Sequence, residues 1–489
     1  MRQPARLALV LFACASAYAV QGVGFNRNAH YALVQALTYG TPVIDRYRGT
    51  TADVSYFHGH YYANKAPGLA FVDLPVYAAL RGVGIAHTGP VSANPSRTDI
   101  AVVWLLGLWS ALLPALGLLV LVARAADEIE PGYGVAAAAT LGGATMILPF
   151  SELLFAHSLS AFLAFASFAL LQRRRPALAG LVGGLAICVE YPLAIVALLL
   201  CAYAARGGLR RALEYGAGAA AGLVPLALYD WWAFGSPTHL SYRDAVLQAT
   251  HTGFFGLGTP SPDALGDLLF SSVGLLVITP VVALGAIALV PLWRRGRRAE
   301  AALFAAVAVC FLLYTAGFVT PIGGETPGPR YLIPLLPFLA VPLALAWRAW
   351  PLVTASLAAA SAAYMSLLTS TGAVRAGNGH WASDFRHGHF VSTLGSYAGL
   401  PRAVAIVPWF VLLGLAGWIA LGRRIPRPSD VLVAPAALGA WLAIALVGPR
   451  LFTSSELGNQ HPGVTPLVIA AIAAAAALIV ATPRWTRVP

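Results

Sequence analysis

The sequence predicts an all-α polytopic membrane protein with about fourteen transmembrane helices and a large first outer loop that contains interfacial helices. Composition is the first observation: hydrophobic residues make up 58% of the 489 residues and charged residues only 10%, whereas soluble domains carry about 25% charged residues. The second is that apolar runs approaching or exceeding the roughly 17 to 25 residues that cross a bilayer recur along the chain. The third is that arginines gather in short pieces between alternate runs. No segment has the composition of an independent soluble domain.

One apolar segment, 67–86, is not expected to cross the membrane. It contains Asp73, Pro75 and Arg81, and a charge at the bilayer centre costs about 2.5 to 3.5 kcal/mol. We expect this segment to lie along the outer interface or to re-enter the membrane. The predicted spans are 5–23, 99–123, 135–150, 157–171, 177–190, 191–205, 213–232, 269–292, 301–320, 331–349, 351–369, 403–421, 431–447 and 464–482.

The positive charges orient this chain. With the amino terminus inside and 67–86 not crossing, the cytoplasmic pieces hold 19 basic and six acidic residues, and the outer pieces hold 12 basic and 13 acidic residues. Basic residues concentrate on the cytoplasmic side of membrane proteins, so both ends are predicted to be cytoplasmic. The net charge of +12 is then a topology signal, and no nucleic-acid partner is expected.

The first span also resembles a secretory signal, because Arg2 and Arg6 precede an apolar run that ends in the small-residue triplet 17–19. We expect an uncleaved span, and either interpretation exports the residues that follow. The sequence divides into region 1–232, which includes the first outer loop 24–98, and region 233–489, a carboxy-terminal transmembrane region. The outer loops of the second region are 233–268, 321–330, 371–402 and 448–463. Outer loops are rich in His, Asp, Tyr and Trp, so function is predicted to face outward.

Lys65, in the first outer loop, is the only lysine in the chain, against 30 arginines. An ammonium is a compact charge, whereas a guanidinium is a planar fork, so a retained lysine indicates a site that needs an ammonium. The stretch before it predicts a helix over 28–40, with Gly40 as its carboxy-terminal cap. The loop from residue 24 to residue 68 is therefore predicted to carry the chemistry.

The same loop offers two carboxylates, Asp45 and Asp53, that can take a proton from a hydroxyl group. Asp53 follows two threonines, and capping of the next turn explains it equally simply. His58 and His60 are spaced to share a metal, although a pair in a loop is weak evidence for one. A divalent metal is left open, and no other cofactor is predicted.

Ionisable residues also lie where spans meet the outer face. Glu152 and His157 separate the third span from the fourth, and Glu190 interrupts an apolar run. Such groups are expensive unless they pair or line a watery cavity, although a place among the lipid headgroups explains Glu190 as well. Arg330 begins a span, where helix dipoles disfavour cations. Either a phosphate or an ordinary ion pair with Glu325 accounts for this arginine.

Several stretches together resemble the GT-C class of membrane glycosyltransferases, in particular the protein O-mannosyltransferases and the lipid A aminoarabinose transferase. They are HYALVQAL, YFHGHYYANKAPGLAFVDLPVYAAL, the polar turn after the third span, and GPRYLIPLLPFL. The resemblance covers roughly the first 200 residues, and beyond them only GPRYL. The resemblance implies that region 1–232 is a GT-C-like catalytic module.

The resemblance implies transfer of a sugar from a polyprenyl-phosphate carrier to a glycan, lipid or protein acceptor at the outer face of the plasma membrane. An outer-loop carboxylate would act as base, basic residues would hold the lipid phosphate, and direct displacement would invert the sugar. Membrane lipids are further expected partners. The candidate residues fall into three groups: catalytic Asp53, Asp45, Glu152 and His157; phosphate-binding Lys65, Arg330, Arg27 and Arg243; and acceptor or sugar contacts Tyr61, Tyr62, His60, Glu190 and Glu325.

The chain departs from this family in two places. Relatives carry an acidic residue at the start of the first loop helix, where this chain has Asn26, Arg27 and Asn28. After the third span, where relatives often have an aspartate, it offers Glu152 and His157. Two alternatives stay open: a transporter or lipid flippase of the cell envelope, and a relative without catalytic activity.

Overall fold

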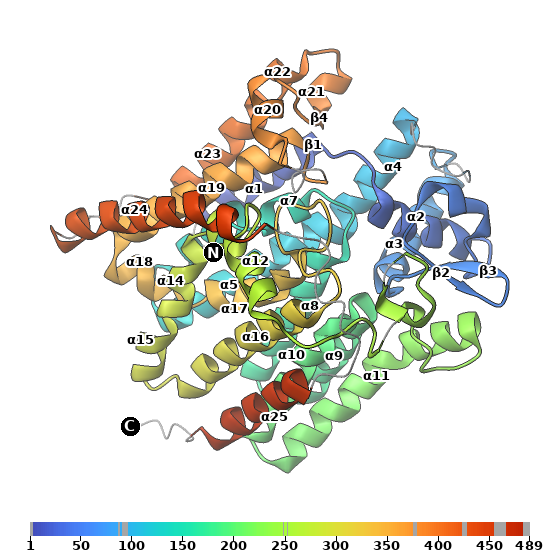
Figure 1. The fold of residues 1–489 in the computed structure, drawn as a ribbon, viewed down its shortest axis with the longest axis horizontal. Coiled ribbons are helices and arrows are strands. Elements are labelled where there is room, and N and C mark those ends of the chain that lie inside the picture. Colours follow the sequence, from blue (N-terminus) through green and yellow to red (C-terminus); the bar gives the residue numbers. More distant parts are fainter. Residues whose placement is uncertain are drawn as a thin grey trace.

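Helices make up most of the chain, and two short antiparallel strand pairs accompany them (Figure 1). The structure is a computed structural model, and it describes residues 3–86, 89, 96–247, 249–251, 253–374, 379–422, 428–453 and 466–482. Most of the predicted loop 448–463 lies outside these residues. The predicted helical fold class is confirmed for the part of the chain that the structure describes.

The apolar helices are those of a multi-pass membrane protein. Within the described ranges, five helices are long and apolar enough to cross a bilayer, or seven if each of two bent helix pairs is one span. The two pairs bend by 99° near residue 280 and by 55° near residue 341. Each of the fourteen segments predicted from the sequence is helical over most of its described length. The number of spans, and the interfacial position of 67–86, stay predictions.

The helices of the apolar region include one continuous helix of 33 residues, Arg97–Ile129, which contains a π-helical segment. Ser96 begins it with a capping box, because its hydroxyl accepts a hydrogen bond from the backbone N–H of Asp99 and the Asp99 carboxylate accepts one from that of Ser96. The elements of this region are α1 (Gln3–Tyr18), α4 (Arg97–Gly107), η2 (Leu108–Leu112), α5 (Leu113–Ile129), α6 (Gly134–Gly143), α7 (Ile147–Ser151), α8 (Ala156–Gln172), α9 (Pro176–Val189), α10 (Ala194–Ala205), α11 (Leu209–Phe234), α12 (Pro262–Phe270), α13 (Leu275–Ile278), α14 (Val281–Ile287), α15 (Leu289–Arg294), α16 (Arg298–Gly317), α17 (Leu336–Ala340), α18 (Leu343–Ala349), α19 (Pro351–Gly372), α23 (Val407–Leu421), α24 (Pro428–Leu451) and α25 (Pro466–Ala481).

Shorter elements lie between the apolar helices. Strand β1 pairs antiparallel with β4, which ties the end of α1 to the segment that follows α19. These elements are β1 (Ala19–Val20), α2 (Phe25–Leu37), η1 (Asp45–Thr50), β2 (Val54–Phe57), β3 (His60–Ala63), α3 (Gly68–Gly82), η3 (Tyr191–Leu193), η4 (Ser241–Asp244), η5 (Ala249–His251), η6 (Arg330–Leu335), α20 (Trp381–Arg386), β4 (Ser392–Thr393), α21 (Leu394–Tyr397) and α22 (Arg402–Ala405).

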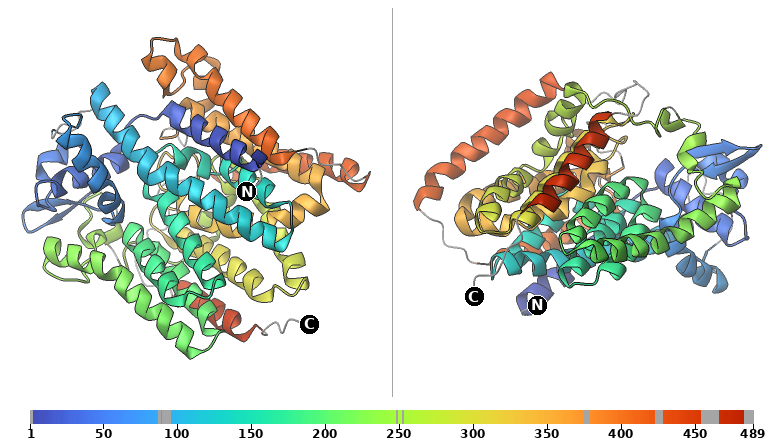
Figure 2. Two further views of the ribbon diagram at one scale, coloured as in Figure 1. Left: turned by 180° about the vertical axis from the view of Figure 1, so that it is seen from behind. Right: turned by 90° about the horizontal axis from the view of Figure 1, so that it is seen from below.

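Residues 24–86 fold into one lobe, called the loop lobe below. In Figure 1 this lobe lies on the side of the molecule away from both chain ends, and both views of Figure 2 show it projecting from the helical region. Its helix α2 is buried from Arg27 to Ala36, because α3, β3 and η1 pack around it. A helix is thus confirmed in this stretch, but it begins three residues before the predicted start and its C-cap is Thr38. Gly40, the predicted cap, follows in the left-handed region, at φ 70°.

Strands β2 and β3 form a hairpin that the sequence analysis did not predict. His58 and Gly59 make its two-residue turn with φ values of 48° and 90°, which is typical of a type I′ turn. The ladder pairs Val54 with Ala63 and Phe57 with His60. The hairpin packs against the end of α11, where Phe234 contacts the rings of Phe57 and Tyr62.

Glycines allow three helices to approach one another closely. A Cβ added at Gly184 in α9 or at Gly222 in α11 would overlap the backbone of the facing helix, as expected where small residues line a helix interface. Gly68, the first residue of α3, lies in the same way against the end of α9, where an added Cβ would fall 2.6 Å from the carbonyl oxygen of Cys188. This contact brings the loop lobe against the end of α9.

The substitution Gly68→Ala tests this packing. The added methyl group meets the backbone of α9, so we expect a loss of stability of about 1 to 3 kcal/mol, the usual cost of overpacking. The measurement is the apparent melting temperature of the purified protein in detergent. Gly82→Ala is the matched control, since Gly82 ends the same helix and has open space where the Cβ would lie. Equal melting temperatures for the two variants would contradict the proposed contact.

Candidate functional site

The hairpin of the loop lobe places Lys65 beside Asp53. The backbone N–H of Asn64 donates to the carbonyl of Asp53 (3.3 Å), which extends the ladder by one residue. The Lys65 ammonium then lies 3.3 Å from a carboxylate oxygen of Asp53, and both side chains are almost fully buried. The Thr51 hydroxyl accepts from the backbone N–H of Asp53. Asp53 therefore forms an ion pair and does not cap a helix.

The start of α8 and the end of α9 form a second wall. His157 lies in the first turn of α8, and Glu190 follows the last residue of α9. The Nδ1 atom of His157 contacts Glu190 Oε1, and the Ser160 hydroxyl donates to Glu190 Oε2 (2.5 Å). Glu190 is thus paired, and its position relative to the lipid headgroups stays a prediction. Both carboxylate oxygens are held, so the position of the imidazole ring is well defined.

Arg330, at the start of η6, forms a third wall. Its guanidinium lies 5.5 Å from the ring centroid of Phe155 and 5.3 Å from that of Tyr331, which gives it cation–π contacts. Gly323, at φ 84°, makes room for it, since an added Cβ would lie 2.8 Å from Arg330 Nε. That Nε atom is buried and has no hydrogen-bond partner among the described residues. Arg330 is therefore a buried cation with an unused donor.

Helix α2 closes the site with Asn26 and His30, one helical turn apart. His30 is 2% exposed, and its Nδ1 has no partner within the described ranges. Burial, and then the charge of Lys65, lower the pKa of His30 to about 3. The ring is therefore neutral at physiological pH, and it can offer a ligand hydrogen bonds but no positive charge.

These walls enclose one polar cleft. Four of the sequence candidates line it: Lys65, His157, Glu190 and Arg330. Asp53 does not line it but forms an ion pair with Lys65. Its free volume is about 30 Å³, enough for ordered water but not for a sugar, so a substrate has to widen it. The lining residues are Asn26, His30, Lys65, Ala66, Phe155, Ala156, His157, Val189, Glu190, Tyr191, Tyr242, Arg330 and Tyr331.

Nine of these lining residues were not among the sequence candidates, and five of the nine are polar: Asn26, His30, Tyr191, Tyr242 and Tyr331. Asn26 and His30 lie on one face of α2, but the helix predicted over 28–40 includes only His30. Tyr191 follows Glu190 directly, and its hydroxyl group lies 3.1 Å from that of Ser241 in η4. Tyr242 had no signal, since only tertiary contacts bring its loop to the hairpin. There the Ser55 hydroxyl donates to the Ser241 carbonyl (2.5 Å).

Other predicted site residues lie elsewhere in the loop lobe. Asp45 is exposed, accepts from the backbone N–H of Tyr61 and lies 2.7 Å from His60 Nδ1. His58 occupies the hairpin turn and stacks on Phe57. Tyr62 is buried against Phe234. Among the described residues, no group of three or more His, Cys, Asp or Glu side chains is placed to hold a metal ion.

Three further candidates are also not brought to the cleft. Arg243 and Glu325 are exposed, and no ion pair joins Glu325 to Arg330 within the described ranges. Arg27 is 1% exposed and donates to the carbonyl of Gln21 (3.2 Å). Burial lowers the pKa of Arg27 to about 9. A role for these residues in binding stays a prediction.

A larger cavity, of about 640 Å³, lies between α1, α5, α6, α19 and α23. Its walls are mostly Ala, Gly, Leu and Val, and it shares no lining residue with the polar cleft. No ionisable side chain is among the described residues that line it.

Glu152 belongs to a second buried cluster, outside the cleft. Its carboxylate accepts hydrogen bonds from Gln21 Nε2 and from Trp409 Nε1, each at 2.8 Å. Gln21 also donates to the carbonyl of Thr369 (3.2 Å). Glu152 therefore joins the end of α1, α7, α19 and α23. This arrangement supports a structural role, although its catalytic assignment from the sequence is untested.

Replacing Glu152 should change how stability depends on pH. Burial, opposed by the hydrogen bonds from Gln21 and Trp409, raises the pKa of Glu152 from 4.5 to about 8. Between these values the unfolded chain releases a proton that the folded protein retains, so stability falls as pH rises. We expect Glu152→Gln to raise the apparent melting temperature relative to wild type more at pH 8 than at pH 5. Glu325→Gln, which alters an exposed carboxylate, is the control, and parallel curves for wild type and Glu152→Gln would refute the interpretation.

No protein-family model matches the chain, and comparison with curated proteins gives no match. Similar solved structures include ArnT from Cupriavidus metallidurans bound to undecaprenyl phosphate, with a TM-score of 0.47, 15% identity and coverage of 97% of this chain and 76% of ArnT. The apo state of ArnT has a TM-score of 0.46 and 16% identity, with coverage of 93% of this chain and 75% of ArnT. The apo oligosaccharyltransferase of Archaeoglobus fulgidus has a TM-score of 0.43 and 14% identity, with coverage of 94% of this chain and 61% of that protein. ArnT and the oligosaccharyltransferase are GT-C glycosyltransferases, the class that the sequence resembles.

Proposed function

We propose that this protein transfers a sugar from a polyprenyl-phosphate carrier to an acceptor at the outer face of the plasma membrane. The observation that carries the proposal is the convergence of Lys65, Arg330, Glu190 and His157 on one buried cleft, with Asp53 paired to Lys65. The cleft combines cations for a phosphate with groups that can accept a proton. Glycosyl transfer from a lipid phosphate requires both.

Lys65 and Arg330 are suited to hold the phosphate. The Lys65 ammonium is a compact charge, and the Arg330 guanidinium has an unused Nε–H donor. Both side chains are buried, where a charge interacts more strongly than in water. When the bond between the sugar and the phosphate breaks, negative charge develops on the phosphate oxygens. Cations already in position stabilise that charge without reorganisation.

The proposed reaction is a direct displacement. An acceptor hydroxyl attacks the anomeric carbon from the side opposite the phosphate, so the sugar is inverted and no covalent enzyme intermediate forms. Binding both substrates in one cleft lowers the entropic part of the barrier. The cleft must widen for the sugar. Its walls come from three different parts of the chain: the loop lobe, the start of α8 with the end of α9, and η6. We expect these parts to move apart when the sugar binds.

The proposed topology has fourteen spans, both chain ends in the cytoplasm and the loop lobe outside. It is supported by the helical state of each predicted span over most of its described length. The acceptor is a glycan, a lipid or a protein of the cell envelope. A transporter or flippase is the alternative, and an activity assay separates the two, because transport leaves the bond between sugar and phosphate intact.

A transfer assay with Lys65→Met tests the function. Purified protein is incubated with radiolabelled polyprenyl-phosphate hexoses and pentoses and with membrane extract as the source of acceptor. We expect transfer by the wild type and a loss of about 10²- to 10³-fold in the variant, the usual effect of removing one group that stabilises a developing negative charge.

Arg46→Met is the matched control, since Arg46 is an exposed cation of the same loop and its loss should leave transfer unchanged. Undiminished transfer by Lys65→Met would refute the phosphate site. Absence of transfer by the wild type with every donor would refute the function.

A further inference from the structure

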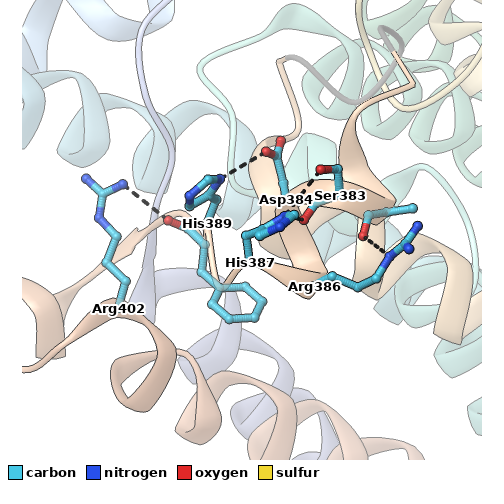
Figure 3. Close-up of polar contacts among 8 residues, drawn as sticks. Ser383, Asp384, Arg386, His387, His389 and Arg402 are labelled. Atoms are coloured by element: carbon cyan, nitrogen blue, oxygen red, sulfur yellow. Dashed lines mark hydrogen bonds and ion pairs between the residues drawn. The ribbon is translucent and has the colours of Figure 1, made fainter.

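Four histidines of the described residues form ion-pair contacts with carboxylates. They are His60 with Asp45, His157 with Glu190, His239 with Asp244, and His389 with Asp384. Figure 3 shows the last pair, which joins Asp384 in α20 to His389 in the loop that follows, with His389 Nδ1 3.3 Å from Asp384 Oδ1. Of the four histidines, only His157 lines the polar cleft.

The geometry of His157 is that of an oriented base. Its Nδ1 faces Glu190, and Glu190 is itself held by the Ser160 hydroxyl. A carboxylate at Nδ1 keeps the proton on that nitrogen and leaves the lone pair on Nε2, the arrangement that lets an imidazole act as a general base. The side chain of His157 is 5% exposed, whereas that of His389 is 68% exposed. Burial also excludes bulk water as a competing proton acceptor.

Two other candidates for the base, Asp53 and His30, are less suited to the role. Asp53 does not line the cleft, and its carboxylate lies 3.3 Å from the Lys65 ammonium, which it serves as counter-ion. The pKa of His30 is lowered to about 3 by burial and by Lys65, so this ring is a weak base near pH 7. The structure offers His30 no carboxylate comparable to Glu190 among the hydrogen bonds and ion pairs of the described residues.

We propose, resting on the glycosyltransferase function above, that His157 is the general base, that Glu190 positions it, and that the acceptor group is a hydroxyl. The acceptor oxygen forms a bond to the anomeric carbon, and its proton moves to His157 Nε2. The bond between that carbon and the phosphate oxygen breaks, and polyprenyl phosphate leaves with the electron pair. Asp53 serves as the counter-ion that fixes Lys65.

The surroundings of His157 determine how activity depends on pH. The charged and titratable groups around it are Glu190 at the end of α9, Tyr191 on η3, Arg330 and Tyr331 on η6, Tyr242 on η4, His30 on α2, and Lys65 after the hairpin. Glu190 stabilises the positive charge that the ring gains when it accepts the proton. Since only a neutral imidazole accepts a proton, transfer should fall as the pH is lowered.

The first test measures the pH profile of His157→Gln with radiolabelled polyprenyl-phosphate sugars and membrane extract. We expect kcat to fall about 10²- to 10⁴-fold, the usual contribution of a general base, while KM for the donor stays nearly constant. The acidic limb of the profile should disappear, which a loss of packing alone would not cause. Retained melting temperature and donor KM show that the variant is folded. His389→Gln, at the exposed pair of Figure 3, is the matched control and should keep both rate and profile.

A second test restores the missing base. His157→Ala leaves space for a free imidazole, and added imidazole should recover part of the lost transfer. Glu190→Gln should lower kcat with little change in donor KM, and Glu190→Asp should retain more activity than Glu190→Gln. Asp53→Asn should instead raise KM for the donor and keep the acidic limb.

The outcomes separate the two proposals. Transfer by the wild type together with an unchanged kcat or an unchanged acidic limb in His157→Gln would overturn the assignment of the base and leave the glycosyltransferase function standing. A failure of imidazole to raise transfer by folded His157→Ala would also count against the base. Absence of transfer by the wild type would overturn both proposals.

Discussion

Charge burial is the constraint on which the site depends. Two cations, Lys65 and Arg330, and two carboxylates, Asp53 and Glu190, are withdrawn from water where the loop lobe meets the helices. A buried charge is costly unless it is paired, and the partners here come from distant parts of the chain. The charge pairs at the cleft therefore also hold these distant parts of the chain together. Lys65 and Arg330 are therefore already removed from water before a phosphate binds.

Close backbone approach makes this junction possible. Gly68 lets α3 begin against the end of α9, beside Glu190, and glycines at the α9–α11 interface let these two helices approach without intervening side chains. The hairpin then places Lys65 opposite Asp53, and Phe234 at the end of α11 packs on the hairpin. The geometry of the polar cleft thus depends on glycines that do not line it.

Division of roles between the acidic groups follows from their partners. Asp53 faces an ammonium, Glu190 faces an imidazole, and Glu152 accepts two neutral donors outside the cleft. A carboxylate beside a cation stabilises charge, whereas a carboxylate beside an imidazole orients a proton acceptor. Under the proposed function, this difference assigns the role of base to His157 in a chain that has no acidic residue at the start of its first loop helix.

The sequence by itself determined the membrane-protein class, the helical segments and the loop that contributes Lys65. Each of these follows from composition and periodicity, which act over short distances along the chain. It also singled out Asp53, His157, Glu190 and Arg330, because isolated charges stand out in an apolar chain. Only the tertiary structure decided which of them meet. Both Asp45 and Asp53 are candidate bases by sequence. In the structure Asp45 lies exposed at the start of η1, where it contacts His60, whereas the hairpin places Asp53 beside Lys65. Tyr242 and the partnership of His157 with Glu190 depend on contacts between remote segments, and such contacts leave no local pattern from which to predict them.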